Sequence, residues 1–221
     1  MKTTSRFPHF GTAGSLLGAS LLALAIAMPA SAQGQTSQQS PPAGQAQAQS
    51  ADQVIQDWPD VSKKAAQAMM EKYGQPQGVT PKMLVWEDNA PWARTIVYGE
   101  EIDHDFPMPH KDVLEQVIPY DVPADMFDDL AEYDGSVIAE RTKGTLAARC
   151  DKEAANFLAV NLANDIVKGE KSIEEARQAY ADAMKAVMAG DPPEITQAFT
   201  FEVNRGFAGN PGETIMDTAE Q

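Results

Sequence analysis

The densest group of side chains capable of chemistry lies in the stretch HDFPMPHKD, residues 104–112. His104 and His110 are the two histidines beyond the N-terminal segment, and Asp105 and Asp112 lie beside them. Imidazole and carboxylate groups bind zinc and other transition ions, and a histidine can also act as a general base. Two hypotheses follow: a metal centre with His104, Asp105 and His110 as ligands, or an acid/base group.

The spacing within this stretch argues against a shared ion. Pro107 and Pro109 fix their own φ angles and bias the residues before them toward extended backbone. At about 3.1 Å per residue, the six steps from His104 to His110 span roughly 19 Å. We therefore expect no metal ion and no other cofactor here. We expect His110 in the first turn of a short helix over about 109–118, with Asp112 at the positive end of the helix dipole.

Cys150 is the single cysteine of the chain and is a second candidate for chemistry. As a nucleophile it would need a histidine base, His104 or His110, and a helix N-terminus or cation to lower its pKa. The spacing Leu146, Cys150, Ala154, Leu158, Leu162, Ile166 instead predicts one long helix with Cys150 in the core. A strand over 145–150, returning from a hairpin at Lys143-Gly144, is the open alternative.

The common catalytic motifs are absent from the sequence. There is no G-x-S-x-G, H-E-x-x-H, P-loop or dinucleotide fingerprint. The absence of these motifs therefore favours a protein without enzymatic activity.

Other elements are predicted from periodicity and turn residues. Val61, Ala65, Met69 and Tyr73 recur every four residues and predict a helix that ends at Gly74. The runs 82–87 and 94–99 predict an antiparallel strand pair, and a further helix is expected over 123–134. Ser172 to Glu175 forms a capping box for the last helix. Apolar residues between 195 and 203 suggest a final strand.

The N-terminal segment is typical of an export signal. Lys2 and Arg6 precede the apolar run 16–28, which at 13 residues is shorter than the about 20 that a membrane helix needs. Ala30-Ser31-Ala32 suits signal peptidase, so we expect cleavage after Ala32 and no membrane span afterwards. Residues 33–50 are rich in Gln, Pro and Ala and predict a disordered linker.

Charge limits the classes of partner. The formal net charge is −15, which argues against nucleic acid. Segment 100–134 is strongly acidic with one base, Lys111, and is interpreted as a solvated face or as a cation-binding module.

These observations predict a single α+β domain over 51–207, an antiparallel sheet packed by four to five helices, with a flexible tail over 208–221. The predicted function is an exported, periplasmic or secreted acidic protein, a non-catalytic binding or accessory component of the cell envelope with an unknown protein or small-molecule partner. The alternatives are a small periplasmic cysteine hydrolase using Cys150 with His104 or His110, and a cation-binding module on 100–134.

Overall fold

The chain forms an α+β fold around one antiparallel sheet. The computed structural model describes residues 49–204, 206–207 and 209–216. The sheet has six strands in the order β1-β2-β3-β4-β6-β5. The strands are β1 (Gly78–Thr80), β2 (Met83–Glu87), β3 (Arg94–His104), β4 (His110–Pro119), β5 (Val137–Glu140) and β6 (Thr145–Cys150).

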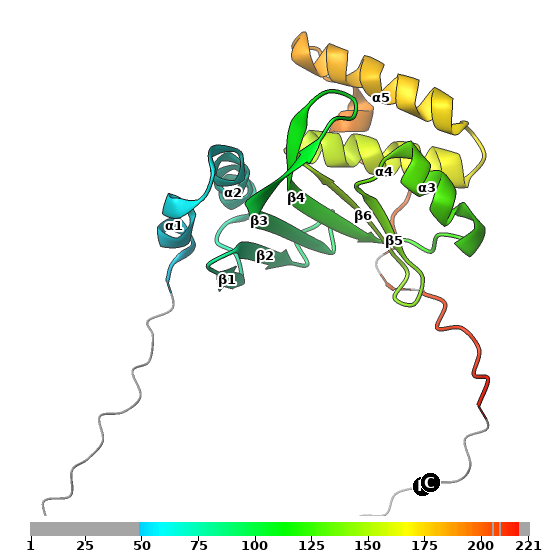
Figure 1. Ribbon diagram of the computed structural model, residues 1–221, viewed down its shortest axis with the longest axis horizontal. Helices are drawn as coiled ribbons and strands as arrows, with labels where there is room; N and C mark the ends of the chain where they lie inside the picture. Colours follow the sequence, from blue (N-terminus) through cyan, green and yellow to red (C-terminus); the bar gives the residue numbers. More distant parts are fainter. Residues whose placement is uncertain (1–48, 205, 208, 217–221) are drawn as a thin grey trace, which may run out of the picture. The chain divides into compact units, whose positions relative to one another are not determined.

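Among the described residues, five α-helices accompany the sheet. They are α1 (Ala51–Val54), α2 (Asp60–Tyr73), α3 (Phe127–Tyr133), α4 (Glu153–Val167) and α5 (Ile173–Met188), with short 3₁₀ turns at Ile55–Asp57, Ala124–Met126 and Glu194–Thr196. Figure 1 shows α2 and α4 lying on the same side of the sheet, with α5 stacked on α4. The predicted α+β fold, an antiparallel sheet with four to five helices, is confirmed in class and in this count for the described residues.

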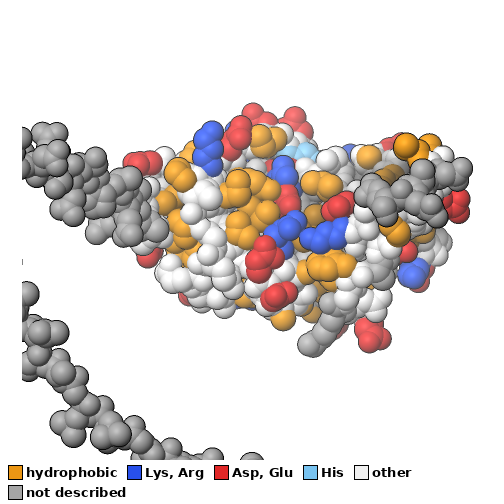
Figure 2. Space-filling model, turned by 90° about the horizontal axis from the view of Figure 1, so that it is seen from below, with side chains coloured by type: hydrophobic (Ala, Val, Ile, Leu, Met, Phe, Trp, Pro, Cys, Tyr) orange, Lys and Arg blue, Asp and Glu red, His pale blue; other side chains and the backbone are white. Residues whose placement is uncertain are grey.

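The core lies between the sheet and these helices. Alternate residues of each strand face the helices, for example Leu84 on β2, Val97 on β3 and Leu114 on β4, all fully buried. In Figure 1 no helix of the described residues lies on the opposite face, and Figure 2 shows the molecule from that side. That face carries half-buried apolar side chains such as Ile96, beside an ion pair between Arg149 and Glu115. Helices therefore pack on one side of the sheet, although residues 112–119 of the central strand β4 are buried on both faces.

Several predicted elements are confirmed. The pair β2–β3 is antiparallel, with Leu84 opposite Val97, and α2 ends at Gly74, whose φ is +79°. Ser172 and Glu175 form the expected capping box of α5. The described helices include none that is long and apolar enough to cross a membrane. The predicted signal peptide, and the predicted linker up to residue 48, lie outside the described residues.

The predicted helix over 109–118 is wrong, because this segment is strand β4. Val113, Leu114, Val117 and Ile118 have helix-like spacing, yet all are buried, since both faces of this central strand are enclosed here. A strand buried on both faces has a nearly continuous apolar run, which periodicity alone does not distinguish from a helix.

The predicted long helix from Leu146 is also wrong. The chain forms β6, then α4 from Glu153, and β5 and β6 form the hairpin that was the alternative. A spacing of four is a multiple of the strand period of two, so Leu146 and Cys150 share a strand face as readily as a helix face.

The expected final strand is absent from the described residues. Asn161 of α4 instead donates to the carbonyls of Ile195 and Ala198 and accepts from the amide of Thr200. A buried side chain thus satisfies backbone groups that a strand would pair, and the segment packs as irregular chain.

Candidate metal centre

The β3–β4 hairpin brings the two histidines together. His104 is directly opposite His110 in the strand register, and their ring centroids are 4.8 Å apart. The expected separation of roughly 19 Å is therefore wrong. Because strand residues alternate between faces, Asp112 follows His110 on the same face of β4. Two imidazoles and a carboxylate converge there, and their ligand atoms all lie within 4.8 Å of one another.

The loop between the strands is anchored by Phe106. Its ring packs 5.1 Å from that of Tyr180 and 6.3 Å from that of Tyr133, measured between centroids. The Arg177 guanidinium also lies over the Phe106 ring, 3.9 Å from its centroid. Strand pairing fixes the two ends of the loop and aromatic packing holds its middle. These tertiary contacts therefore outweigh the local preference of the prolines for an extended chain.

Each imidazole directs one nitrogen toward Asp112 and the other toward a separate acceptor. His110 Nδ1 lies 2.9 Å from the Met108 carbonyl oxygen, and its Nε2 lies 3.1 Å from Asp112 Oδ1. His104 Nε2 lies 3.6 Å from Asp134 Oδ1, and its Nδ1 lies 3.3 Å from Asp112 Oδ2. A carbonyl or carboxylate on the outer nitrogen is the arrangement that orients metal-binding histidines.

Asp112 lies at the centre of the group and is only 2% exposed. Ser136 donates its hydroxyl to Asp112 Oδ2. Within the part of the chain that the structure describes, Asp112 Oδ1 and His104 Nδ1 are buried and have no hydrogen-bond partner. Asp112 Oδ1 lies 3.1 Å from His110 Nε2, and His104 Nδ1 lies 3.3 Å from Asp112 Oδ2. These contacts are short enough for hydrogen bonds, so they fail in angle rather than in distance. Buried polar atoms without partners are uncommon and call for an explanation.

The charges of the group are strongly coupled. Contacts with Asp112 and Cys150 raise the pKa of His110 to about 11, although burial would lower it. Burial would raise the pKa of Asp112, but contacts with His110 and Ser136 bring it below its ordinary value. Burial raises the pKa of Asp134. These contacts favour the charged forms of both His110 and Asp112.

Cys150 ends β6 and adjoins this group. The residue is 5% exposed, and its Sγ lies 3.3 Å from His110 Nε2. Burial raises the pKa of the thiol, while the contact with His110 acts in the opposite direction. The cysteine is buried, as the sequence predicted, but at the end of a strand and in contact with a histidine rather than in the middle of a helix. Lys152 is the N-cap of the helix that follows.

The remaining predicted residues are placed differently. Asp105 is exposed in the loop and is not among the converging groups. Of the acidic segment 100–134, only Asp112 and Asp134 contact the histidines. Sequence reasoning gave Asp112 a helix-dipole role and missed Asp134 and Ser136. The pattern His-x-Asp on a strand was the available signal for Asp112, because alternation places both side chains on one face.

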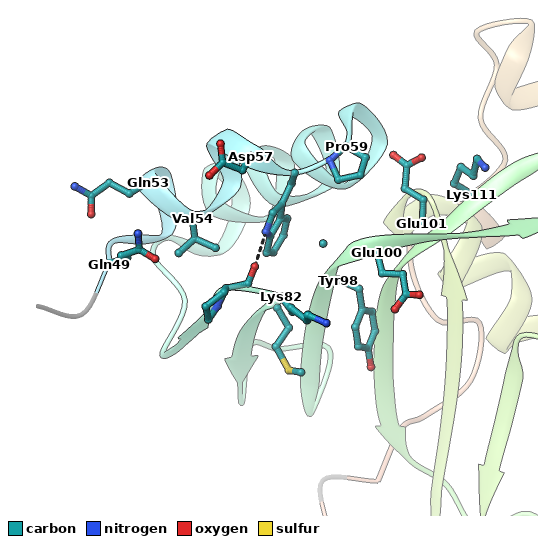
Figure 3. Close-up of a pocket in the computed structure, with 14 residues that line it drawn as sticks. Gln49, Gln53, Val54, Asp57, Pro59, Lys82, Tyr98, Glu100, Glu101 and Lys111 are labelled. Carbon is teal, nitrogen blue, oxygen red and sulfur yellow. Dashed lines mark hydrogen bonds between the residues drawn. The ribbon is translucent and has the colours of Figure 1, made fainter. Parts of the chain in front are cut away.

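Two hollows elsewhere on the surface do not include this group. Figure 3 shows an open one of about 890 Å³ between α1, the start of α2 and β3, where Trp58 donates its indole N–H to the Pro81 carbonyl. Acidic side chains such as Glu101 and basic ones such as Lys111 both line it. A second, of about 400 Å³, is lined in part by Trp92 and Pro119. Neither is lined by the histidines, Asp112 or Cys150.

Comparison of the chain with protein-family models, with curated proteins and with solved structures finds no match. The chemistry of this group therefore has to be argued from its own geometry.

Proposed function

We propose that the protein is an exported, non-catalytic metal-binding domain of the cell envelope that holds one divalent transition-metal ion of the zinc type. His104, His110 and Asp112 are its ligands. The observation that carries the proposal is the convergence of two imidazole nitrogens on a buried carboxylate, with His104 Nδ1 and Asp112 Oδ1 lacking hydrogen-bond partners among the described residues. An ion between these atoms would satisfy both.

The distances support a tetrahedral ion. Zinc lies 2.0–2.2 Å from nitrogen and oxygen ligands, so two such ligands at a tetrahedral angle are about 3.4 Å apart. The two histidine–Asp112 contacts, one to each carboxylate oxygen, measure 3.1 and 3.3 Å. The largest separation in the group, up to 4.8 Å, exceeds this value, so an ion would draw the ligands together by about 1.4 Å. The His104 and His110 side chains are 18% and 13% exposed, which leaves a route for a small ion.

Ligand type narrows the choice of metal. Calcium takes six to eight oxygen ligands and magnesium prefers oxygen and water, whereas imidazole suits zinc, copper, iron and nickel. The exposed carboxylates of the surrounding acidic segment favour the approach of cations over anions. A first-row divalent transition ion fits this donor set best.

A cysteine hydrolase is the second candidate, favoured by the 3.3 Å contact between Cys150 Sγ and His110 Nε2. However, the same nitrogen also faces Asp112, whereas a catalytic aspartate orients its histidine through the other ring nitrogen. Cys150 is also almost fully buried, so a substrate carbonyl would have no access. Native-state labelling with iodoacetamide separates the two: a nucleophile is modified rapidly, and a buried thiol only after unfolding.

Equilibrium dialysis of the purified protein against zinc, followed by elemental analysis, tests the proposal. The wild type should retain one zinc ion per chain, and His104→Ala, His110→Ala and Asp112→Asn should retain none at the same free zinc concentration. Asp105→Asn is the matched control, since it removes an equal charge from the neighbouring loop without touching the group. Equal zinc in all variants, or none in the folded wild type, would contradict the proposal.

A further inference from the structure

We propose that Cys150 is a fourth metal ligand, so that the ion is enclosed by two histidines, one aspartate and one thiolate. This inference rests on the proposed metal-binding function and adds the complete set of protein ligands. Its basis is the position of the sulfur: Cys150 Sγ lies 3.3 Å from His110 Nε2, the nitrogen that also faces Asp112. For zinc–sulfur and zinc–nitrogen bonds of about 2.3 and 2.05 Å, tetrahedral ligands are roughly 3.6 Å apart.

The fold places Cys150 beside His110 by strand pairing, although its sulfur is not among the ligand atoms that lie within 4.8 Å of one another. Cys150 is opposite Leu114, and strand alternation puts Leu114 on the same face of β4 as Asp112 and His110. The side chains of both strands therefore point toward the helices at the same end of the sheet, where Figure 1 shows the extended β3–β4 hairpin. The thiol approaches the group from the interior, while the histidines approach it from the hairpin.

The start of α4 holds this end of β6 in place. Glu153, three residues after Cys150, accepts hydrogen bonds from Lys72 and Tyr73 of α2, from the Trp92 indole and from Gln116 of β4. These bonds join α4 to α2 and to the sheet. The main chain at Cys150 is thus positioned before any ion binds, as a ligand supplied by a rigid element should be.

Burial and charge favour a thiolate ligand at this place. Asp112, with its unpartnered Oδ1, is 2% exposed and Cys150 is 5% exposed, so the interior side of the group is closed to water. A divalent ion bound to one carboxylate and one thiolate forms a centre with no net charge, which lowers the cost of burying it. On binding, the sulfur–hydrogen bond of Cys150 and the Nε2–hydrogen bond of the charged His110 ring both break, sulfur–metal and nitrogen–metal bonds form, and the two protons leave to solvent.

Four protein ligands define the class of metal and the role. A closed four-ligand site leaves no position for a metal-bound water, so it stabilises or carries an ion rather than performing hydrolysis. Thiolate ligation selects zinc, cobalt or copper over magnesium, calcium and manganese. The site is therefore suited to holding a thiophilic ion in an exported protein.

Cobalt(II) spectroscopy of the wild-type protein tests this inference directly. Tetrahedral Co²⁺ gives visible d–d bands, and a thiolate ligand adds a strong sulfur-to-cobalt charge-transfer band in the near ultraviolet. Because Cys150 is the single cysteine, such a band is assigned without ambiguity. We expect both signals in the wild type and in Asp105→Asn. Cys150→Ser should lose the charge-transfer band and bind Co²⁺ more weakly, by more than the roughly 10–100-fold that loss of an outer-shell partner costs.

The outcomes separate the two proposals. Visible bands without a charge-transfer band in the wild type would overturn the ligand role of Cys150 and leave a three-ligand site. No Co²⁺ spectrum at all would overturn metal binding itself. If Cys150→Ser does not fold, thiol labelling of the wild type under partly unfolding conditions decides. Zinc should slow the modification of Cys150 at least tenfold more than it slows unfolding, with unfolding followed by a signal that does not involve the thiol. Equal slowing of labelling and unfolding would refute ligation.

Discussion

Glu153 offers a stringent test of how the centre is held, because it is a carboxylate that four donors surround. Lys72, Tyr73, Trp92 and Gln116 all donate to it, and burial alone would raise its pKa. The hydrogen bonds outweigh burial, so the pKa of Glu153 lies below its ordinary value. Glu153→Ala removes the acceptor from all four donors at once.

The magnitude follows from the donors left behind. Trp92 is 1% exposed, so its indole N–H would be buried without an acceptor, at about 1–3 kcal/mol. Gln116 retains a contact of 3.3 Å with Thr95 Oγ1 and loses less. The Lys72 side chain is 48% exposed, so solvent screens its bond and this bond adds little. We therefore expect Glu153→Ala to lower the free energy of unfolding by about 2–4 kcal/mol, mainly through the buried donors left without an acceptor. Glu153→Gln keeps one carbonyl acceptor and should cost about 1–2 kcal/mol.

Urea unfolding of both variants with a chelator present, at a series of pH values, is the assay. A carboxylate whose pKa is lowered by folding stabilises the fold fully above its unfolded pKa of about 4.3, and this contribution is lost as pH falls through the lower folded pKa. The difference in unfolding free energy between wild type and Glu153→Gln should therefore be largest at neutral pH and should decrease in acid. A gap that is constant with pH, or a cost of Glu153→Ala below about 1 kcal/mol, would refute this reasoning.

Three further predictions concern the centre and the N-terminus. Zinc at 100 times its dissociation constant should stabilise the wild type by about 2.7 kcal/mol. By differential scanning fluorimetry this is roughly 5–10 °C in Tm, which His110→Ala should abolish and Asp105→Asn should keep. Phe106→Ala should weaken zinc binding in calorimetry, because it frees the loop between the histidines without removing a ligand; unchanged affinity would show that the anchor is unnecessary. Intact mass of protein from an exporting host should place the N-terminus at Gln33, and retention of residues 16–28 would contradict the export signal.

The sequence was sufficient for elements whose signals are local. The α2 periodicity ending at Gly74, the turn between β2 and β3 and the capping box at Ser172 are all read within a few residues. Segments decided by tertiary packing were misjudged. β4 appears helical because both of its faces are buried, and β6 with α4 appears as one helix because a spacing of four suits both periods.

The sequence identified only some residues of the candidate centre, because tertiary packing also decides how these residues come together. His104, His110 and Cys150 stood out by residue type, but proline preferences predicted an extended chain where strand pairing and the packing of Phe106 bring the histidines together. Asp134 comes from the end of α3, a segment whose approach to the hairpin has no local sequence signal. Contacts between distant segments depend on strand order, and no short motif encodes that order here.

X-ray absorption at the zinc edge of the zinc-loaded protein tests the central claim most directly, because it reports the ligands of the ion itself. The account predicts a four-coordinate ion with nitrogen and oxygen scatterers at about 2.0–2.2 Å, including two imidazoles, and one sulfur at about 2.3 Å. Loss of the sulfur in Cys150→Ser, and loss of imidazole scattering in His110→Ala, should follow. A six-coordinate shell of oxygen atoms without imidazole or sulfur would contradict it.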